Sequence, residues 1–236
     1  MSFPNAPYTI FPLGDSALSI DFGNVIDESI NQLVIARFQQ LQKAPLLFMR
    51  DAVPAYSSLS IFYDTAELKK IAHPKGTAFE WMKEKTEEWL RQAVVASDVQ
   101  SRLVKIPVCY EPEFAPDINK AAAQKNISTE ELIQIHTGKQ YRVYMLGFLP
   151  GFAYMGELDE RIMMARKPQP VAMTAGSVGI AGKQTGIYPM ASPGGWQIIG
   201  RTPLKLFNNG DGQPTLLDAG DTVQFYAISK NDFYST

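Results

Sequence analysis

The sequence predicts an α+β protein, made of a small N-terminal α/β domain and a second domain that is mostly β. Two observations predict this fold class. Strand and helix patterns alternate over the first hundred residues, whereas short apolar strands separated by Gly and Pro dominate after Gln140. The texture of the sequence changes across the stretch VVASDVQSRL. We therefore place the two domains at residues 1–98 and 99–236.

The first domain opens with strands and a helix. Apolar residues alternate on either side of a Gly-Asp turn in residues 8–23, which predicts two short strands. Asp27 stands where it can cap a helix, and apolar residues keep helical spacing until Pro45 ends it. The pattern in residues 46–64 predicts two further strands.

A second helix is predicted after Thr77. Thr77 and Glu80 have the spacing of a capping box, in which each side chain bonds the backbone N–H of the other residue. A buried stripe follows at helical spacing: Phe79, Met82, Trp89, Leu90 and Val94. These strands and helices together predict a small sheet with helices packed on it.

The second domain begins with a predicted strand in residues 103–110. Two short helices follow in residues 117–126 and 128–138, the second with a Ser128/Glu131 capping box. After Gln140 no segment has a convincing helical period, so we expect strands only. They are predicted in YRVYMLGF, GSVGIAG, QIIGR, LKLF and DTVQFYAI. Several short strands at such spacing predict a barrel or a sandwich.

Composition excludes some classes of protein. The chain has 236 residues, a net charge of −2 and a single cysteine, Cys109. The lone cysteine excludes an intrachain disulfide and suits a reducing compartment. The sequence has no bilayer-length apolar run, no signal-peptide pattern at its start and no Lys/Arg cluster. We therefore expect a cytoplasmic protein without a nucleic-acid or membrane partner.

The stretch GSVGIAGKQTG superficially resembles a phosphate-binding loop. That loop needs Gly where Ser177 stands and Ser or Thr where Gln184 follows Lys183. No helix follows, so no helix dipole would face a phosphate. We therefore interpret Lys183 as a surface or groove residue, and ATP bound in another way stays open.

Other reactive side chains give weak signals. Ser177 and Ser192 lack the flanking glycines of a nucleophile elbow, and Cys109 on a strand is typical of a small buried hydrophobe. His73 lies in a predicted exposed loop. His136 ends a predicted helix, where it serves either as a favourable charge near the helix C-terminus or as a site residue. Two histidines and one cysteine so far apart predict no metal site.

Two segments combine Gly and Pro with large aromatic residues. They are YRVYMLGFLPGFAYMGELDERI and GIYPMASPGGWQIIGRTP. Linkers are poor in large apolar groups because nothing in them packs. The segments therefore hold either turns with core aromatics or rigid loops that present aromatics at the mouth of a pocket. The aromatic residues are Phe148, Phe152, Tyr154, Tyr188 and Trp196.

Three motifs, GFLPGFAYMGELD, GSVGIAGKQTGIYP and SPGGWQIIGRTPLKLF, closely resemble the KipI/PxpB family. That family is also described as allophanate hydrolase subunit 1 or the carboxyltransferase C–D domain, and the resemblance covers essentially the whole chain. It implies a small α/β domain joined to a cyclophilin-like β-barrel domain. It also implies partners, a larger PxpC-type subunit and a PxpA-type subunit, which together form an ATP-dependent 5-oxoprolinase that opens 5-oxoproline to glutamate.

The sequence departs from the family pattern in ARKPQPVAMTAGSV. Val171 stands where the family has a second Arg, and Thr174 stands where it has Pro. An anion-binding role of that arginine would be lost here or pass to Arg166, Lys167 or Arg201.

The leading hypothesis is therefore one subunit of an ATP-dependent 5-oxoprolinase. We expect ATP with Mg²⁺ to bind through the complex and neither ATP nor substrate to bind this chain strongly alone. Lys183 and Arg201 would stabilise negative charge, and His136 would transfer a proton. The expected substrate-binding residues are Phe148, Phe152, Tyr154, Ser177, Gln184, Thr185, Tyr188, Gly194, Gly195, Trp196 and Thr202.

The five aromatic residues are expected to line a groove for a partner or a shared pocket. Trp196→Ala or Phe152→Ala should then weaken association or activity more than they change the fold. Two alternatives remain open. One is an inhibitor that docks on the helical bundle of a sporulation sensor histidine kinase through an exposed apolar groove. The other is a carboxyltransferase or allophanate hydrolase-type subunit, which would need biotin carried on another polypeptide.

Overall fold

The computed structural model describes residues 6–72, 75–94, 101–210 and 212–235. The chain divides into two compact units, Met1–Gln100 and Ser101–Thr236, each with its own hydrophobic core. The predicted boundary at residues 98 and 99 and the predicted exposed loop at His73 lie outside the described residues. No helix in the described part of the chain combines the length and apolar character that a bilayer span requires.

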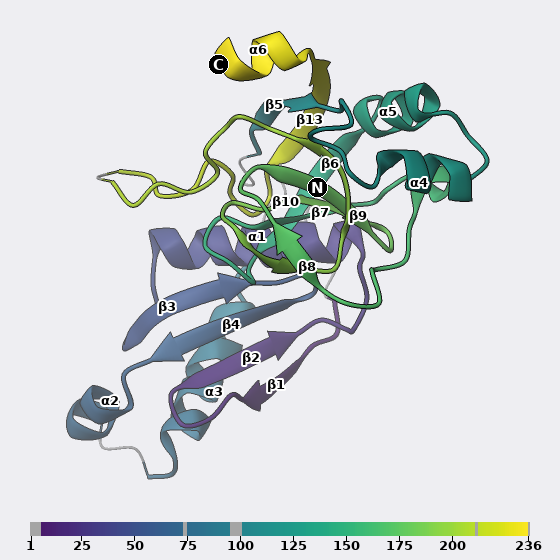
Figure 1. The fold of residues 1–236 in the computed structure, drawn as a ribbon. Helices are drawn as coiled ribbons and strands as arrows, with labels where there is room; N and C mark the ends of the chain where they lie inside the picture. The colour runs from purple at the N-terminus through teal and green to yellow at the C-terminus, as the bar shows by residue number, and fades with distance from the viewer. Residues whose placement is uncertain (1–5, 73–74, 95–100, 211, 236) are drawn as a thin grey trace. The chain divides into compact units, whose positions relative to one another are not determined.

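The first unit contains a four-stranded antiparallel sheet in the order β1-β2-β4-β3, drawn side by side in Figure 1. The strands are β1 Thr9–Pro12, β2 Ala17–Asp21, β3 Met49–Pro54 and β4 Ser58–Tyr63, and the helices are α1 Glu28–Lys43, α2 Thr65–Ala72 and α3 Ala78–Leu90. All four predicted strands and both predicted helices are confirmed. Helix α2 was not predicted from the sequence.

Local capping signals begin both long helices of this unit. The Asp27 carboxylate accepts a hydrogen bond from the backbone N–H of Ile30 at 3.0 Å. Thr77 and Glu80 form the complete capping box, with each side chain bonded to the backbone of the other residue. One face of the sheet packs against the apolar stripes of α1 and α3 in a single core, which includes Leu18, Ile20, Leu59, Ile61, Val34 and Met82.

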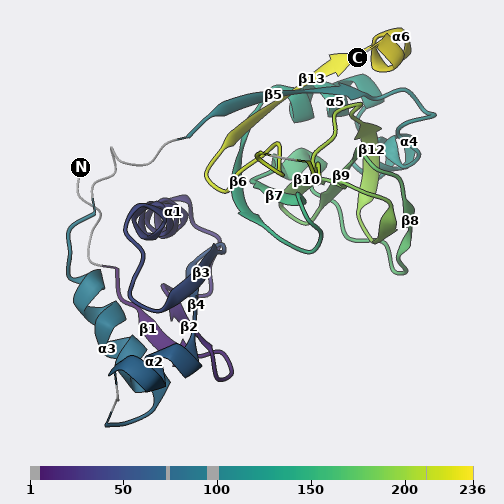
Figure 2. The same ribbon diagram turned by 90° about the vertical axis from the view of Figure 1, so that its left-hand side faces the viewer.

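The second unit is a closed barrel with the strand order β10-β7-β6-β13-β5-β12-β9, whose strands curve around the interior in Figure 2. Its strands are β5 Leu103–Cys109, β6 Gln140–Leu146, β7 Ala153–Gly156, β9 Ser177–Ala181, β10 Gln184–Ile187, β12 Gln197–Arg201 and β13 Thr222–Ile228. Strands β5 and β13 are parallel, and the other neighbours are antiparallel. Of the two predicted architectures, the barrel is therefore correct.

Shorter elements cover the barrel. Strands β8 Val171–Met173 and β11 Ser192–Gly194 form a separate two-stranded sheet. Helices α4 Ile118–Gln124 and α5 Thr129–Thr137 agree with the two predicted helices, and Ser128 caps α5 by accepting from Glu131 N at 3.0 Å. Apolar residues of α4 and α5 pack against the barrel core.

Two expectations for this unit are wrong. The segment LKLF forms no strand, because only Phe207 pairs, through a single bridge to Thr215. A helix also follows Gln140, namely α6 Lys230–Ser235, which lies beside the end of β13 in Figures 1 and 2. The Ser229 hydroxyl accepts from Asp232 N at 3.2 Å, so a local cap helps this short helix to form. The spacing of these two residues is a signal in the sequence that could have predicted the helix.

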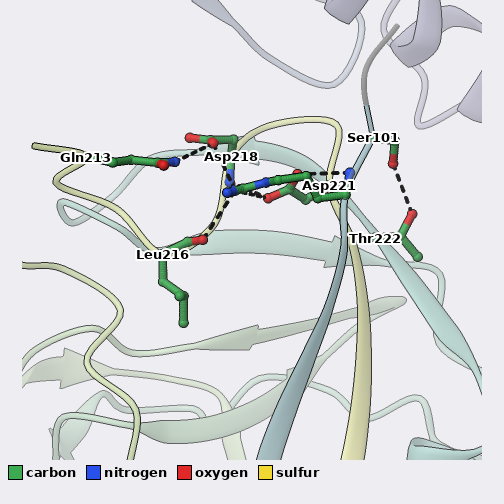
Figure 3. A network of polar contacts seen from close by, with 7 residues as sticks. Ser101, Gln213, Leu216, Asp218, Asp221 and Thr222 are labelled. Carbon is green, nitrogen blue, oxygen red and sulfur yellow. Dashed lines mark hydrogen bonds and ion pairs between the residues drawn. The ribbon is translucent and has the colours of Figure 1, made fainter.

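A polar network around Arg102 fixes the start of β5 to the loop before β13 (Figure 3). Arg102 donates from Nε to Asp221 at 3.1 Å and from a terminal nitrogen to Asp221 and Asp218 at 2.6 and 2.9 Å. Asp221 also accepts from the backbone N–H of Asp218 at 2.9 Å. The Asp221 side chain is 4% exposed, whereas that of Asp218 is 50% exposed. Asp221 is therefore the buried centre of this network.

We expect Asp221→Asn to lower the free energy of unfolding of the barrel unit by about 1–3 kcal/mol, because a buried acceptor loses charge-assisted hydrogen bonds. Asp218→Asn is the matched control, and it should cost less than about 1 kcal/mol because its pair with Arg102 is exposed. Urea unfolding followed by circular dichroism measures both. Equal effects of the two substitutions would contradict the assignment of Asp221 as the centre of the network.

Candidate functional site

Five aromatic side chains form one cluster at the barrel, which we call the aromatic cluster: Phe148, Phe152, Tyr154, Tyr188 and Trp196. Phe152 is its hub, because its ring centroid lies 5.6, 4.8, 5.2 and 5.5 Å from the other four in that order. All four ring pairs have edge-to-face geometry, which aromatic rings prefer.

Glycines let this cluster close. A Cβ on Gly194 would overlap the Tyr188 hydroxyl, and a Cβ on Gly186 would lie 3.0 Å from the rings of both Phe152 and Trp196. Larger residues at these two positions would therefore push the rings apart. The segment that carries Gly186 and Gly194 is therefore part of a packed cluster rather than a linker.

The cluster is closed rather than an open groove. Phe152, Tyr188 and Trp196 are buried, Tyr154 is half-buried and Phe148 is 61% exposed. The expectation that all five residues line a groove is therefore wrong, because four of the rings cover one another. Phe148 alone among the five presents most of its surface.

His136 lies in the interior of the barrel unit, fully buried at the end of α5. Its Nδ1 is 2.8 Å from the Tyr110 hydroxyl, and its Nε2 is 3.0 Å from the Thr185 hydroxyl. Thr185 in turn donates to the carbonyl oxygen of Gly179 at 3.1 Å. Because Thr185 uses its hydrogen on Gly179, it accepts from Nε2–H of His136, and Nδ1 then accepts from Tyr110.

This network holds a neutral imidazole. Burial lowers the pKa of His136 from 6.5 to about 3, because the charged imidazolium would lose its hydration in the interior of the unit. The ring also stacks on Phe225 with centroids 4.6 Å apart. His136 and Thr185 therefore form an internal structural contact, and the proton-transfer role expected for His136 has no support in this geometry.

Three of the expected site residues, Ser177, Arg201 and Thr202, line two clefts, and Arg201 lines both of them. The first cleft has a volume of about 380 Å³ and lies between β8 and the ends of β9 and β12. Its lining includes the cations Lys167 and Arg201, the hydroxyls of Thr174 and Ser177, and the apolar side chains of Met173 and Ile198. Because Met173 and Ile198 also pack in the core formed by the buried aromatic rings, the aromatic cluster supports this cleft from below.

The second cleft, of about 360 Å³, lies on the other side of Arg201. Its lining includes Thr202, Lys205 and, from α6, Phe233 and Tyr234. The Thr202 hydroxyl accepts from Leu204 N at 3.3 Å. The sequence pointed to Arg201, Ser177 and Thr202 but not to Thr174, Lys205 and the α6 residues, because their proximity depends on how strands and helix pack.

The structure does not bring Lys183 and Arg201 together. Arg201 pairs with Ser177 at the first end of β9, whereas Lys183 lies in the turn after Ala181 at the other end. A rise of about 3.3 Å per residue separates Ser177 from Ala181 by about 13 Å. Gln184 begins β10 next to Lys183. The two residues therefore start from opposite ends of β9, and only Arg201 lines the two clefts.

The remaining site candidates lie near the first cleft or in the core. Gly194 belongs to β11, and the Gly195 carbonyl accepts from Lys167 N at 2.7 Å. Cys109 is buried, and burial raises the pKa of its thiol, which disfavours the thiolate. Among the described residues, no three His, Cys, Asp or Glu side chains are placed to hold a metal ion.

The low pKa of His136 gives a pH-dependent stability. The pKa of His136 is lower in the folded state than in the unfolded state. The contribution of the buried, neutral ring to the free energy of unfolding is therefore complete above pH 6.5 and is lost as the pH falls from 6.5 towards about 3. Over this range it should fall by about 1.4 kcal/mol per pH unit. Urea unfolding of the parent chain and His136→Gln should therefore give a stability difference that shrinks at low pH.

A pH-independent difference would contradict this assignment. If His136→Gln does not fold, NMR titration of the parent chain supplies the test. The His136 ring signals should report a neutral Nε2–H tautomer at pH 7 and at pH 5.

The closed aromatic cluster changes the expected effect of Phe152→Ala. This substitution removes a buried ring and should lower the free energy of unfolding by about 3–5 kcal/mol. Phe148→Ala is the matched control and should change it by about 0.5 kcal/mol, because the ring is exposed. Denaturant unfolding followed by Trp fluorescence measures both. A small effect of Phe152→Ala would restore the interpretation of Phe152 as a surface contact.

Comparison with known proteins agrees with this fold and these motifs. Residues 8–217 match the family described as carboxyltransferase domain, subdomain C and D. A 5-oxoprolinase subunit of Bacillus subtilis (strain 168) is 46% identical over 231 residues, covering 97% of this chain and 96% of that protein. The 5-oxoprolinase subunit of the same name in Escherichia coli O157:H7 is 32% identical, covering 90% of this chain and 93% of that protein.

A solved structure extends the comparison. The crystal structure of TTHA0988 superposes with a TM-score of 0.77 and 32% identity over 91% of this chain. This chain spans only 40% of that longer chain. Fold, motifs and relatives agree, and the chain belongs to the carboxyltransferase domain, subdomain C and D family.

Proposed function

We propose that this chain is one subunit of an ATP-dependent 5-oxoprolinase, which hydrolyses 5-oxo-L-proline to L-glutamate. The observation that carries the proposal is the 46% identity, over 97% of the chain, to a protein named as a 5-oxoprolinase subunit. A protein named as a subunit acts with others. We propose a larger PxpC-type subunit and a PxpA-type subunit as the partners, in the cytoplasm.

The position of the clefts supports a shared active site. Arg201 is the expected catalytic residue that lines both clefts, while Lys183 lies at the far end of β9 and His136 is buried. The groups that transfer protons would then come from a partner. The length of the TTHA0988 chain, of which this chain spans 40%, supports a unit that works beside further domains.

The chemistry explains why ATP is needed. The amide of a five-membered lactam is a poor electrophile, so we propose that ATP phosphorylates its carbonyl oxygen. ADP leaves in this step. Water then attacks the activated carbon, and the ring C–N bond breaks as the nitrogen takes a proton, which gives an acyl phosphate. A second water hydrolyses the acyl phosphate to the side-chain carboxylate of glutamate and free phosphate. The intermediates carry negative charge at the reacting carbonyl, which we propose cationic groups of a partner subunit stabilise. We propose that Mg²⁺ and ATP bind through the complex and only weakly to this chain alone.

No specific observation favours the alternatives. Docking on a kinase bundle would use an open aromatic groove, whereas the aromatic cluster among the described residues is packed and exposes mainly Phe148. A carboxyltransferase or allophanate hydrolase-type subunit would need biotin on another polypeptide.

Reconstitution tests the proposal. This chain is combined with its PxpC-type and PxpA-type partners, and glutamate release from 5-oxo-L-proline is measured with and without Mg·ATP. We expect turnover only when all three subunits and ATP are present. The control omits this chain alone.

No turnover by a complete, well-folded complex would reject the function. Calorimetric titration of the isolated chain with Mg·ATP locates the nucleotide. Micromolar affinity there would place the nucleotide site on this chain rather than on a partner.

A further inference from the structure

Arg201 is held in place at two points. Its Nε donates to the Ala175 carbonyl oxygen at 2.8 Å, and its guanidinium carbon lies 5.7 Å from the centre of the Phe233 ring. The carbonyl and the ring fix the plane of the guanidinium, and neither of these two contacts uses a hydrogen of its terminal nitrogens. A fork fixed in this way loses little entropy when it binds a ligand.

The terminal nitrogens of Arg201 have no acidic partner in the described part of the chain. Other cations of the same unit do: Arg102 with Asp218 and Asp221, Arg161 with Asp159, Lys167 with Asp117 and Lys230 with Glu113. Glu113 lines the first cleft beside Arg201, but its carboxylate is already bound by Lys230 and by the Tyr234 hydroxyl at 3.3 Å. Arg201 therefore brings an uncompensated positive charge to the cleft.

Two hydroxyls lie in the same cleft. Thr174 Oγ1 and Ser177 Oγ are 3.1 Å apart and share one hydrogen bond. Each hydroxyl carries one hydrogen, so the pair has a second hydrogen to donate. Ser177 and Arg201 are also direct partners across β9 and β12, which places both residues at the same end of the barrel wall.

The rest of the first cleft is apolar or neutralised. Met173 and Ile198 give it an apolar surface, and Val171 and Ala172 add to it. Lys167 is paired with Asp117 at 2.6 Å, with both side chains largely buried. The Asp117 carboxylate also accepts from Ile198 N at 2.7 Å, so this ion pair stiffens the wall of the cleft. One free guanidinium and one free hydroxyl donor fit a monoanion better than a triphosphate.

We propose that the first cleft binds the carboxylate of a small amino-acid-derived substrate, with Arg201 as the anion-binding residue. This inference rests on the proposed function and places 5-oxo-L-proline in this cleft. Arg201 donates to the carboxylate, the Thr174/Ser177 pair donates the remaining hydroxyl hydrogen, and Met173 and Ile198 pack against the ring methylene groups. The lactam carbonyl then faces away from Arg201, towards groups that a partner subunit supplies.

The test compares two substrates in the reconstituted complex. One is 5-oxo-L-proline, and the other is 2-pyrrolidinone, the same lactam without the carboxylate. The parent complex should prefer 5-oxo-L-proline strongly in kcat/KM. Arg201→Ala should reduce this preference about ten- to one-hundred-fold, since a hydrogen bond to a charged group is lost, with most of the change in KM. Arg201→Lys should give an intermediate preference, because it keeps the charge without the fork.

Lys205→Ala is the matched control, because Lys205 is a cation of the second cleft only. It should leave the preference unchanged. An active complex in which Arg201→Ala keeps the parent preference for the carboxylate would overturn the inference while leaving the proposed function intact.

If the parent complex has no activity, the proposed function fails and binding decides the inference. Millimolar 5-oxo-L-proline is then added to the isolated isotope-labelled chain, with 2-pyrrolidinone as the comparison. Backbone NMR shifts at Thr174 and Ser177 that need both the carboxylate and Arg201 would support the inference. Their absence, or their persistence in Arg201→Ala, would overturn it.

Discussion

The packing of Phe152 against four other aromatic rings is the contact on which the first cleft of the barrel depends. Phe152 directly precedes β7, Tyr188 directly follows β10, and Trp196 directly precedes β12. The ring of Phe152 therefore brings three segments of the chain into contact. Each buried ring contributes on the order of 1.5–3 kcal/mol from the area removed from water. Met173 and Ile198 pack on the same rings and face the first cleft, so the cleft keeps its shape only while this cluster is closed.

A buried polar chain ties a helix to the barrel wall. It runs from Tyr110 through His136 and Thr185 to the carbonyl of Gly179, and each polar side-chain hydrogen along it is donated to the next member. Such a chain stabilises one arrangement because a shift of any member leaves a buried polar group unpaired, at a cost of about 1–3 kcal/mol. A neutral imidazole is required, since a charged one would have no counter-charge in this interior.

The charged side chains of the same unit are held in two different ways. Acidic side chains compensate cations such as Arg102 and Lys167, and these pairs fix loops and strand ends. Arg201 is fixed by a carbonyl and an aromatic ring instead, so its charge is positioned but not neutralised. This difference separates cations that stabilise the fold from a cation available for a ligand.

The sequence by itself determined the features that depend on neighbours along the chain. The Thr77/Glu80 box, the Asp27 cap and the alternation of Leu18 and Ile20 specify local structure, and the three motifs identify the family. Tertiary structure alone decided which distant side chains meet. Closure of the barrel sealed the aromatic rings and buried His136, and strand register put Arg201 beside Ser177 but about 13 Å along β9 from the turn that carries Lys183. Register and closure depend on the packing of all the strands together, so no local pattern of residues specifies them.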